Sequence, residues 1–163
     1  MKTPISFVQP NFQTGPKHLN AFYLPYTSGI LWAYARQNKK ISNNFDVEYF
    51  VYKRHPFVNN FNRVKDSQII FFSVYVWNYK YCLQLAKEVK EHNPKALILF
   101  GGPQLPYSDS EFFDKYPYVD SICVGEGEHV VEQVLLDYLD NKPIEKIVRA
   151  ERIKDMKLPS PYL

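Results

Sequence analysis

Short apolar runs alternate along the chain with segments of helical periodicity. Five apolar runs predict strands, at Pro4–Val8, Phe45–Tyr52, Gln68–Val76, Ala96–Phe100 and Ser121–Val124. The third run is apolar on both faces, which is typical of a central strand that helices cover on both sides.

Helical spacing separates most of these strands. We predict helices over Ser28–Gln37, over Asn78–Pro94 with Asn78 as a candidate cap, over Ser108–Pro117 and over Glu128–Asp140. The alternation predicts an α/β, flavodoxin-like (Rossmann-like) three-layer sandwich, with a five-stranded parallel sheet of order 2-1-3-4-5 and helices on both faces. We expect residues 1–142 to form this domain, and residues 143–163 to hold an edge strand and a linker.

Composition narrows the class of protein. The formal charge is +3, with scattered basic residues in the first 66 positions, so no nucleic-acid partner is expected. No apolar run approaches membrane-spanning length, and we expect a cytoplasmic protein without a membrane partner. The two cysteines, Cys82 and Cys123, lie far apart and form no metal-binding cluster, and neither has a base beside it that would make it a nucleophile.

Unusual residues gather where the predicted strands end. Ser73, Tyr75, Trp77 and Asn78 follow the third strand. Glycine-containing turns follow the next two, at 101–104 and 125–128. Since ligands of open parallel sheets bind beyond the carboxyl ends of the strands, we expect a ligand site at this edge. The glycines would let ligand atoms approach the backbone.

The glycine turns do not match phosphate-binding motifs. A P-loop needs Lys and Ser or Thr after its glycines, whereas Pro103 and Gln104 follow Gly102. The stretch GEGEHV has Val130 where the dinucleotide fingerprint has its third glycine, and it follows the fifth strand instead of the first.

Five stretches, taken in order, carry a more specific likeness. They are YLPYTSGILWAYA, FSVYVWN, LFGGPQLP, YVDSICVGEGEHVVEQVL and LPSPYL. Together they resemble the N-terminal cobalamin (vitamin B12)-binding domain of cobalamin-dependent radical S-adenosylmethionine (SAM) enzymes, over nearly the whole chain. The resemblance implies a cobalt-containing corrin presented to a radical SAM barrel, present as a further domain or a partner subunit, and methyl transfer as the reaction.

The resemblance also implies which residues line cobalamin. They are Ser73, Val74, Tyr75, Val76, Trp77, Asn78, Gly101, Gly102, Pro103, Gln104, Gly125, Glu126 and Gly127. S-adenosylmethionine and a four-iron four-sulfur cluster are implied only for the barrel, whose Cys-x3-Cys-x2-Cys motif this sequence lacks. The chain is therefore not expected to be catalytic alone, and no catalytic or metal-ligating residue is assigned.

A further departure from the family pattern concerns the cobalt ligand, and two alternative functions remain. The wider cobalamin superfamily often ligates cobalt through Asp-x-His-x-x-Gly. Here Pro16 and Ala21 stand where Asp and Gly would flank His18, so ligation by His18 is not expected. The alternatives are a flavodoxin-like interaction module that has lost its cofactor, and a flavin or nucleotide carrier. We expect Gly102→Val to weaken cobalamin binding more than folding.

Overall fold

The computed structural model describes residues 1–16, 21–54, 56–107, 110–149 and 158–161, in eight strands and six helices. The strands are β1 Thr3–Asn11, β2 Gln13–Thr14, β3 Ala21–Phe22, β4 Phe45–Lys53, β5 Ile69–Ser73, β6 Leu97–Gly101, β7 Ser121–Val124 and β8 Ile147–Arg149. The helices are α1 Tyr26–Ala35, α2 Lys39–Asn44, α3 Phe57–Val64, α4 Tyr79–His92, α5 Ser110–Lys115 and α6 Gly127–Leu139.

The main sheet has six parallel strands in the order β4-β1-β5-β6-β7-β8. Its first five strands along the chain follow the predicted order 2-1-3-4-5. The predicted number of five was wrong, because β8 pairs in parallel with β7 and adds a sixth strand. This strand lies within residues 143–163, where an edge strand was expected, and its three residues, none of them fully buried, lack the apolar run that marks the central strands.

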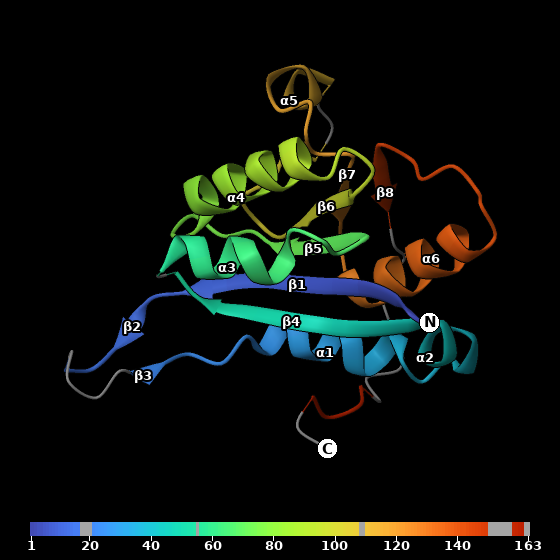
Figure 1. Ribbon diagram of the computed structural model, residues 1–163, viewed down its shortest axis with the longest axis horizontal. Helices are drawn as coiled ribbons and strands as arrows, with labels where there is room; N and C mark the ends of the chain where they lie inside the picture. The colour runs from blue at the N-terminus through green and yellow to red at the C-terminus, as the bar shows by residue number, and fades with distance from the viewer. Residues whose placement is uncertain (17–20, 55, 108–109, 150–157, 162–163) are drawn as a thin grey trace.

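Helices cover both faces of the sheet, as predicted (Figure 1). The strand positions alternate between two apolar clusters, because successive side chains of a strand point to opposite faces. Ile69 and Phe71 pack with α1, α2 and α6, whereas Ile70 and Phe72 pack with α3, α4 and α5. All five residues of β5 are buried, which agrees with the central position predicted from its unbroken apolar run.

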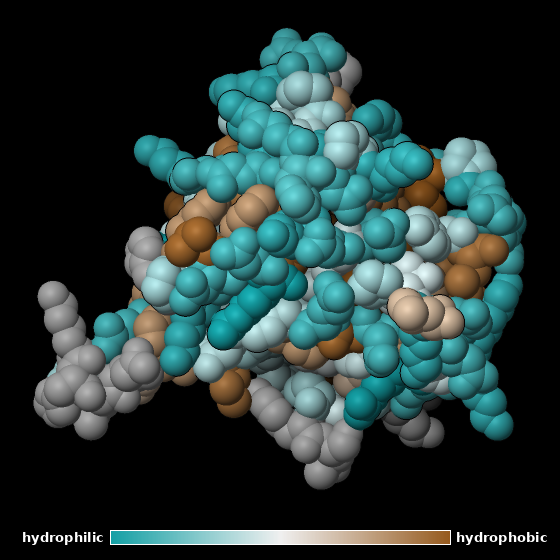
Figure 2. All heavy atoms as spheres, viewed as in Figure 1, coloured by the Kyte–Doolittle hydropathy of each residue, from teal (hydrophilic) through white to brown (hydrophobic). Residues whose placement is uncertain are grey.

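The outer helices show their polar sides to solvent. Cys82, Leu85, Ala86 and Val89 form the buried stripe of α4 at positions i, i+3, i+4 and i+7. Figure 2 shows a mainly hydrophilic surface over α3 and α4. No helix among the described residues is long and apolar enough to cross a membrane.

Helices α2 and α3 and the two strands of the β2–β3 hairpin were missing from the predicted set. Helix α2 buries only Ile41. The Asn38 side chain caps its N-terminus by accepting a hydrogen bond from Lys40 N at 3.0 Å. Helix α3 buries Asn60, whose side chain donates to Lys53 O at 2.7 Å, so a polar residue interrupts its apolar pattern. The short β2–β3 hairpin lies inside the long connection from β1 to α1.

Candidate functional site

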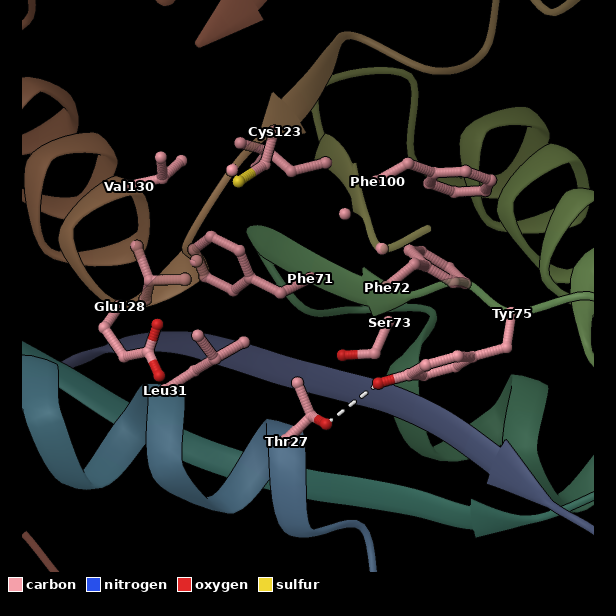
Figure 3. A pocket seen from close by; sticks show the side chains of 16 residues that line it. Thr27, Leu31, Phe71, Phe72, Ser73, Tyr75, Phe100, Cys123, Glu128 and Val130 are labelled. Atoms are coloured by element: carbon pink, nitrogen blue, oxygen red, sulfur yellow. Dashed lines mark hydrogen bonds between the residues drawn. The ribbon is translucent and has the colours of Figure 1, made fainter. Parts of the chain in front are cut away.

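A cavity of about 230 Å³ opens at the carboxyl edge of the sheet, between β5, β6 and β7 and the helices α1 and α6. Its floor is apolar, with Phe71 and Leu99 from the sheet, Leu31 from α1, and Val130 and Val131 from α6. Figure 3 shows the Phe71 ring between the two helices, facing the open space. The fold therefore builds a small apolar chamber at the edge where parallel α/β sheets bind ligands.

Hydroxyl groups form one wall of this cavity. The Thr27 Oγ1 atom, in the first turn of α1, lies 3.0 Å from the hydroxyl oxygen of Tyr75, in the turn after β5. The Ser73 hydroxyl lies on the same side of the cavity in Figure 3. Glu128, in the first turn of α6, brings a carboxylate to another part of the lining. A flat apolar group could therefore pack on the apolar floor of the cavity, and hydroxyl or amide groups could form hydrogen bonds with its polar wall.

Asn78 holds the turn after β5 together instead of capping α4. Its Nδ2 donates to Ser73 O at 3.0 Å, and its Oδ1 accepts from Tyr75 N at 2.8 Å. Asn78 stands at the N-cap position of α4, as predicted, but its side chain is fully buried and makes no capping hydrogen bond to the helix. Its two bonds fix the backbone that presents Ser73 and Tyr75 to the cavity.

The two adjacent glycines have different roles. Gly102 has a φ of +121°, and a Cβ atom built on it would lie 2.3 Å from Val74 O. Beside it, Val74 N donates to Gly101 O at 2.6 Å, so the two loops meet backbone to backbone. Gly101 has no positive φ, and its Cβ would lie 3.5 Å from Cys123 Cβ, an ordinary contact. The chain itself requires Gly102, whereas Gly101 leaves space on the cavity side.

The turn after β7 also serves packing. Gly125 has a φ of +100° and lines the cavity. A Cβ on Gly127 would lie 2.8 Å from Leu31 Cδ2, so this glycine lets α1 and α6 approach each other. Glu126 stands at the N-cap of α6 without a side-chain capping bond.

Exposed aromatic rings continue the site beyond the cavity. We call Phe12, Tyr23, Tyr75 and Trp77 the aromatic ledge. The Tyr75 and Trp77 rings stack with centroids 4.6 Å apart, Phe12 meets Trp77 edge-on at 6.1 Å, and Tyr23 meets Phe12 at 5.5 Å. Asn11, at the end of β1, donates to Tyr23 O at 3.1 Å and so anchors the returning hairpin. Trp77 keeps 42% of its surface exposed.

The structure brings together only part of the predicted set of site residues. Six of them line the cavity, namely Ser73, Tyr75, Gly101, Gly102, Gly125 and Gly127. Val74 is fully buried in the core below the turn. Val76, Trp77, Pro103 and Gln104 are exposed outside the cavity, and Glu126 and Asn78 do not line it.

Other lining residues were not predicted. Thr27 and Leu31 come from α1, and Phe71, Leu99 and Cys123 come from within the strands. The alternation of the strands carried a signal for three of them, because Phe71, Leu99 and Cys123 share one face of the sheet. Thr27 had no such signal, since its position depends on how α1 meets the turn after β5.

The two thiols stay protonated at neutral pH. Burial, together with the nearby Glu128 carboxylate, raises the pKa of the Cys123 thiol to about 11. Burial also raises the pKa of Cys82, which is fully enclosed in the core. Among the described residues no group of three or more His, Cys, Asp or Glu could hold a metal ion. His18, considered above as a cobalt ligand, lies outside the described residues.

The parallel sheet and the chamber at its carboxyl edge define a cofactor-binding α/β domain of flavodoxin-like type. A family model for the B12 binding domain matches residues 39–135, more than half of the chain. The chain therefore belongs to the B12-binding domain family, and cobalamin is the cofactor of that family.

Two curated relatives agree with the resemblance found in the sequence. The cobalamin-dependent radical SAM methyltransferase TokK of Streptomyces tokunonensis is 32% identical over 157 residues, which cover 86% of this chain and 23% of the relative. The 2-(S-pantetheinyl)-carbapenam-3-carboxylate methyltransferase of Streptantibioticus cattleyicolor is 31% identical over 162 residues, covering 89% of this chain and 24% of the relative. The chain thus spans about a quarter of the length of these relatives.

Proposed function

We propose that the cavity receives the nucleotide tail of cobalamin, while the corrin ring lies outside it across the carboxyl edge of the sheet. The size of the cavity is the observation that carries this proposal. At about 230 Å³ it falls below the roughly 300–1,000 Å³ of pockets that enclose whole small ligands. It can therefore hold only a projecting part of so large a cofactor.

The lining suits a flat ring attached to a sugar. A planar aromatic base would pack on Phe71 and Leu99 between α1 and α6. The hydroxyls of Ser73 and of the Thr27–Tyr75 pair, and the Glu128 carboxylate, would hydrogen-bond the sugar hydroxyls and side-chain amides of the cofactor. Gly101 and Gly125 keep the passage from the edge free of side chains.

The aromatic ledge would support the corrin. Trp77 and Tyr75 present stacked, partly exposed rings, and a wide apolar macrocycle needs such a surface. The exposed neighbours Val76, Pro103 and Gln104, together with Glu126, would border the ring. Val74, Asn78 and Gly102 would act indirectly, because they shape the backbone of the two loops.

We infer that the domain serves a cobalamin-dependent radical SAM enzyme of methyltransferase type. When bound, cobalamin would supply the methyl-transfer chemistry. The residues of this chain would hold the tail, orient the corrin and leave its upper face open to a radical SAM barrel. That barrel would carry S-adenosylmethionine and the iron–sulfur cluster, either in the same polypeptide or in a separate subunit, because Cys82 and Cys123 cannot form a cluster motif. Residues 1–142 would then be the cobalamin domain, and residues 143–163 would carry edge strand β8 and lead toward the barrel.

Cobalamin uptake tests this function directly. The purified chain should bind hydroxocobalamin at a 1:1 ratio with a shifted visible spectrum, and binding should raise the melting temperature, Tm, because the ligand binds only the folded state. Cobinamide, the corrin without the nucleotide tail, should bind more weakly since it leaves the cavity unfilled. Absence of uptake, with no rise in Tm, would reject the proposal.

Chemical labelling of Cys123, which lines the cavity, reports whether the cofactor enters it. A maleimide should label one thiol of the native chain, at Cys123, because Cys82 is fully buried. A pKa of about 11 in place of 9.0 leaves about a hundredfold less thiolate, so labelling at pH 8 should be correspondingly slower than that of an ordinary thiol. Bound cyanocobalamin should protect the thiol, as measured by intact mass.

Two observations keep this experiment interpretable. The variant Cys123→Ser should remove the label, which assigns the reactive thiol. Equal labelling rates with and without saturating cyanocobalamin would show that the cofactor does not enter the cavity, even where the spectrum shows binding.

A further inference from the structure

The segment 158–161, with the sequence LPSP, lies against α1. In Figure 1 it is on the opposite side of the molecule from β8, the strand that precedes it in the sequence. Pro161 lines a groove of about 460 Å³ between the start of α1 and the edge strand β4. Leu24 and Tyr26 form one side of this groove, and Phe50 and Tyr52 of β4 form the other. The groove is separate from the cavity assigned to the cofactor, and no function discussed so far uses it.

Gly29 has no side chain, and this leaves the space that Pro161 occupies. A Cβ atom built on Gly29 would lie 2.9 Å from Pro161 Cβ, closer than real Cβ atoms approach other carbons. Glycine within a helix is less stable than alanine, because it loses more conformational freedom on folding. Its presence in the first turns of α1 therefore needs a reason, and the close approach of Pro161 supplies one.

The space that Pro161 occupies lies next to the wall of the cofactor cavity. Thr27, two residues before Gly29, makes the 3.0 Å contact with the Tyr75 hydroxyl. Between them, Ser28 N donates to Gln9 Oε1 at 3.0 Å, which ties the same turn to β1. The first turn of α1 is thus bounded by the cavity on one side and by the segment 158–161 on another.

We propose that residues 158–161 form a clasp that seats in the α1–β4 groove and holds the first turn of α1 in the position that shapes the cofactor cavity. Prolines at 159 and 161 favour this role, because they lose little conformational freedom when the segment is ordered. The clasp also fixes the chain beside α1, so that polypeptide following it would start near the cofactor edge. The link to the cavity rests on the proposed function, whereas the clasp itself does not.

A double-mutant cycle in the full chain tests the clasp. In cofactor-free protein, Gly29→Ala should lower Tm, because the new methyl group displaces Pro161. In the Pro161→Gly background the same change should raise Tm, since only the helical preference for alanine remains. Gly127→Ala is the matched control. Its methyl group meets Leu31 and not the clasp, so its effect on Tm should be the same in both backgrounds.

The link to the cavity is measured by hydroxocobalamin binding. Pro161→Gly should weaken binding about threefold to tenfold, because the cavity wall is then in place for only part of the time. The clasp is rejected if Gly29→Ala shifts Tm equally in both backgrounds. Its link to the cavity is rejected if Pro161→Gly binds hydroxocobalamin as tightly as the native chain. Failure of the native chain to bind would reject the proposed function, and the Tm cycle would still decide the clasp.

Discussion

Gly102→Ala is expected to destabilise the fold by about 3 kcal/mol, because two effects add at this position. A side chain at a φ of +121° is strained whatever space surrounds it, and here the Cβ atom would also lie 2.3 Å from Val74 O. Relief of this contact would separate the loops that the Val74 N to Gly101 O bond joins. For a domain of this size the loss corresponds to a Tm lower by about 6–12 °C, measured by circular dichroism in cofactor-free protein.

This prediction differs from the expectation drawn from the sequence, in which Gly102→Val weakens cobalamin binding more than folding. The backbone of Val74 occupies the space that a side chain on Gly102 would enter. Gly101→Ala is the control, since its Cβ would make only an ordinary contact with Cys123. A Gly102→Ala protein that melts like Gly101→Ala would contradict the assignment of Gly102 to the meeting of the two loops.

The hydrophobic periodicity of the sequence predicted the central strands and helices well, because these elements are deeply buried and their apolar positions form clear patterns. The unbroken apolar run of β5 follows from burial on both faces, and the stripe of α4 follows from burial on one. Weakly buried elements were predicted less completely. Helix α3 has only eight residues and buries the polar Asn60 beside Val64, and it was not predicted although its apolar residues have helical spacing. Strand β8 falls within residues 143–163, where an edge strand was expected, and its weak burial is typical of an edge position.

The candidate site was predicted where it depends on strand ends and was missed where it depends on packing. The glycines at 101, 102 and 125 could be placed at the carboxyl edge, because a parallel sheet brings all such ends together. The sequence could not show that Gly127 makes room for Leu31, or that Thr27 reaches the Tyr75 hydroxyl. These contacts join segments far apart in the chain, and their geometry is set by how α1 and α6 pack.

Gly101→Leu is expected to abolish the binding of the nucleotide tail while leaving the fold intact. Residue 101 follows Leu99 by two positions, so its side chain would point to the same face of the sheet, toward the cavity floor. The cavity of about 230 Å³ has room for an isobutyl group, and no positive φ opposes it. Tm in cofactor-free protein should stay the same or rise, because the added apolar surface is buried. Affinity for hydroxocobalamin should fall about a hundredfold or more, measured by spectral titration.

Cobinamide distinguishes a filled cavity from a damaged domain. Because it has no nucleotide tail, its affinity for Gly101→Leu should stay within about twofold of its affinity for the native chain. The variant Trp77→Ala gives the complementary case, since removal of this ring from the aromatic ledge should weaken the binding of cobalamin and cobinamide alike. If Gly101→Leu instead bound hydroxocobalamin normally, the tail could not lie in this cavity. If it weakened cobinamide as much as cobalamin, the corrin itself, and not the tail, would occupy the space beside Gly101. Opposite effects are therefore expected at the two neighbouring glycines: substitution of Gly102 should lower stability, and substitution of Gly101 should lower affinity for the ligand.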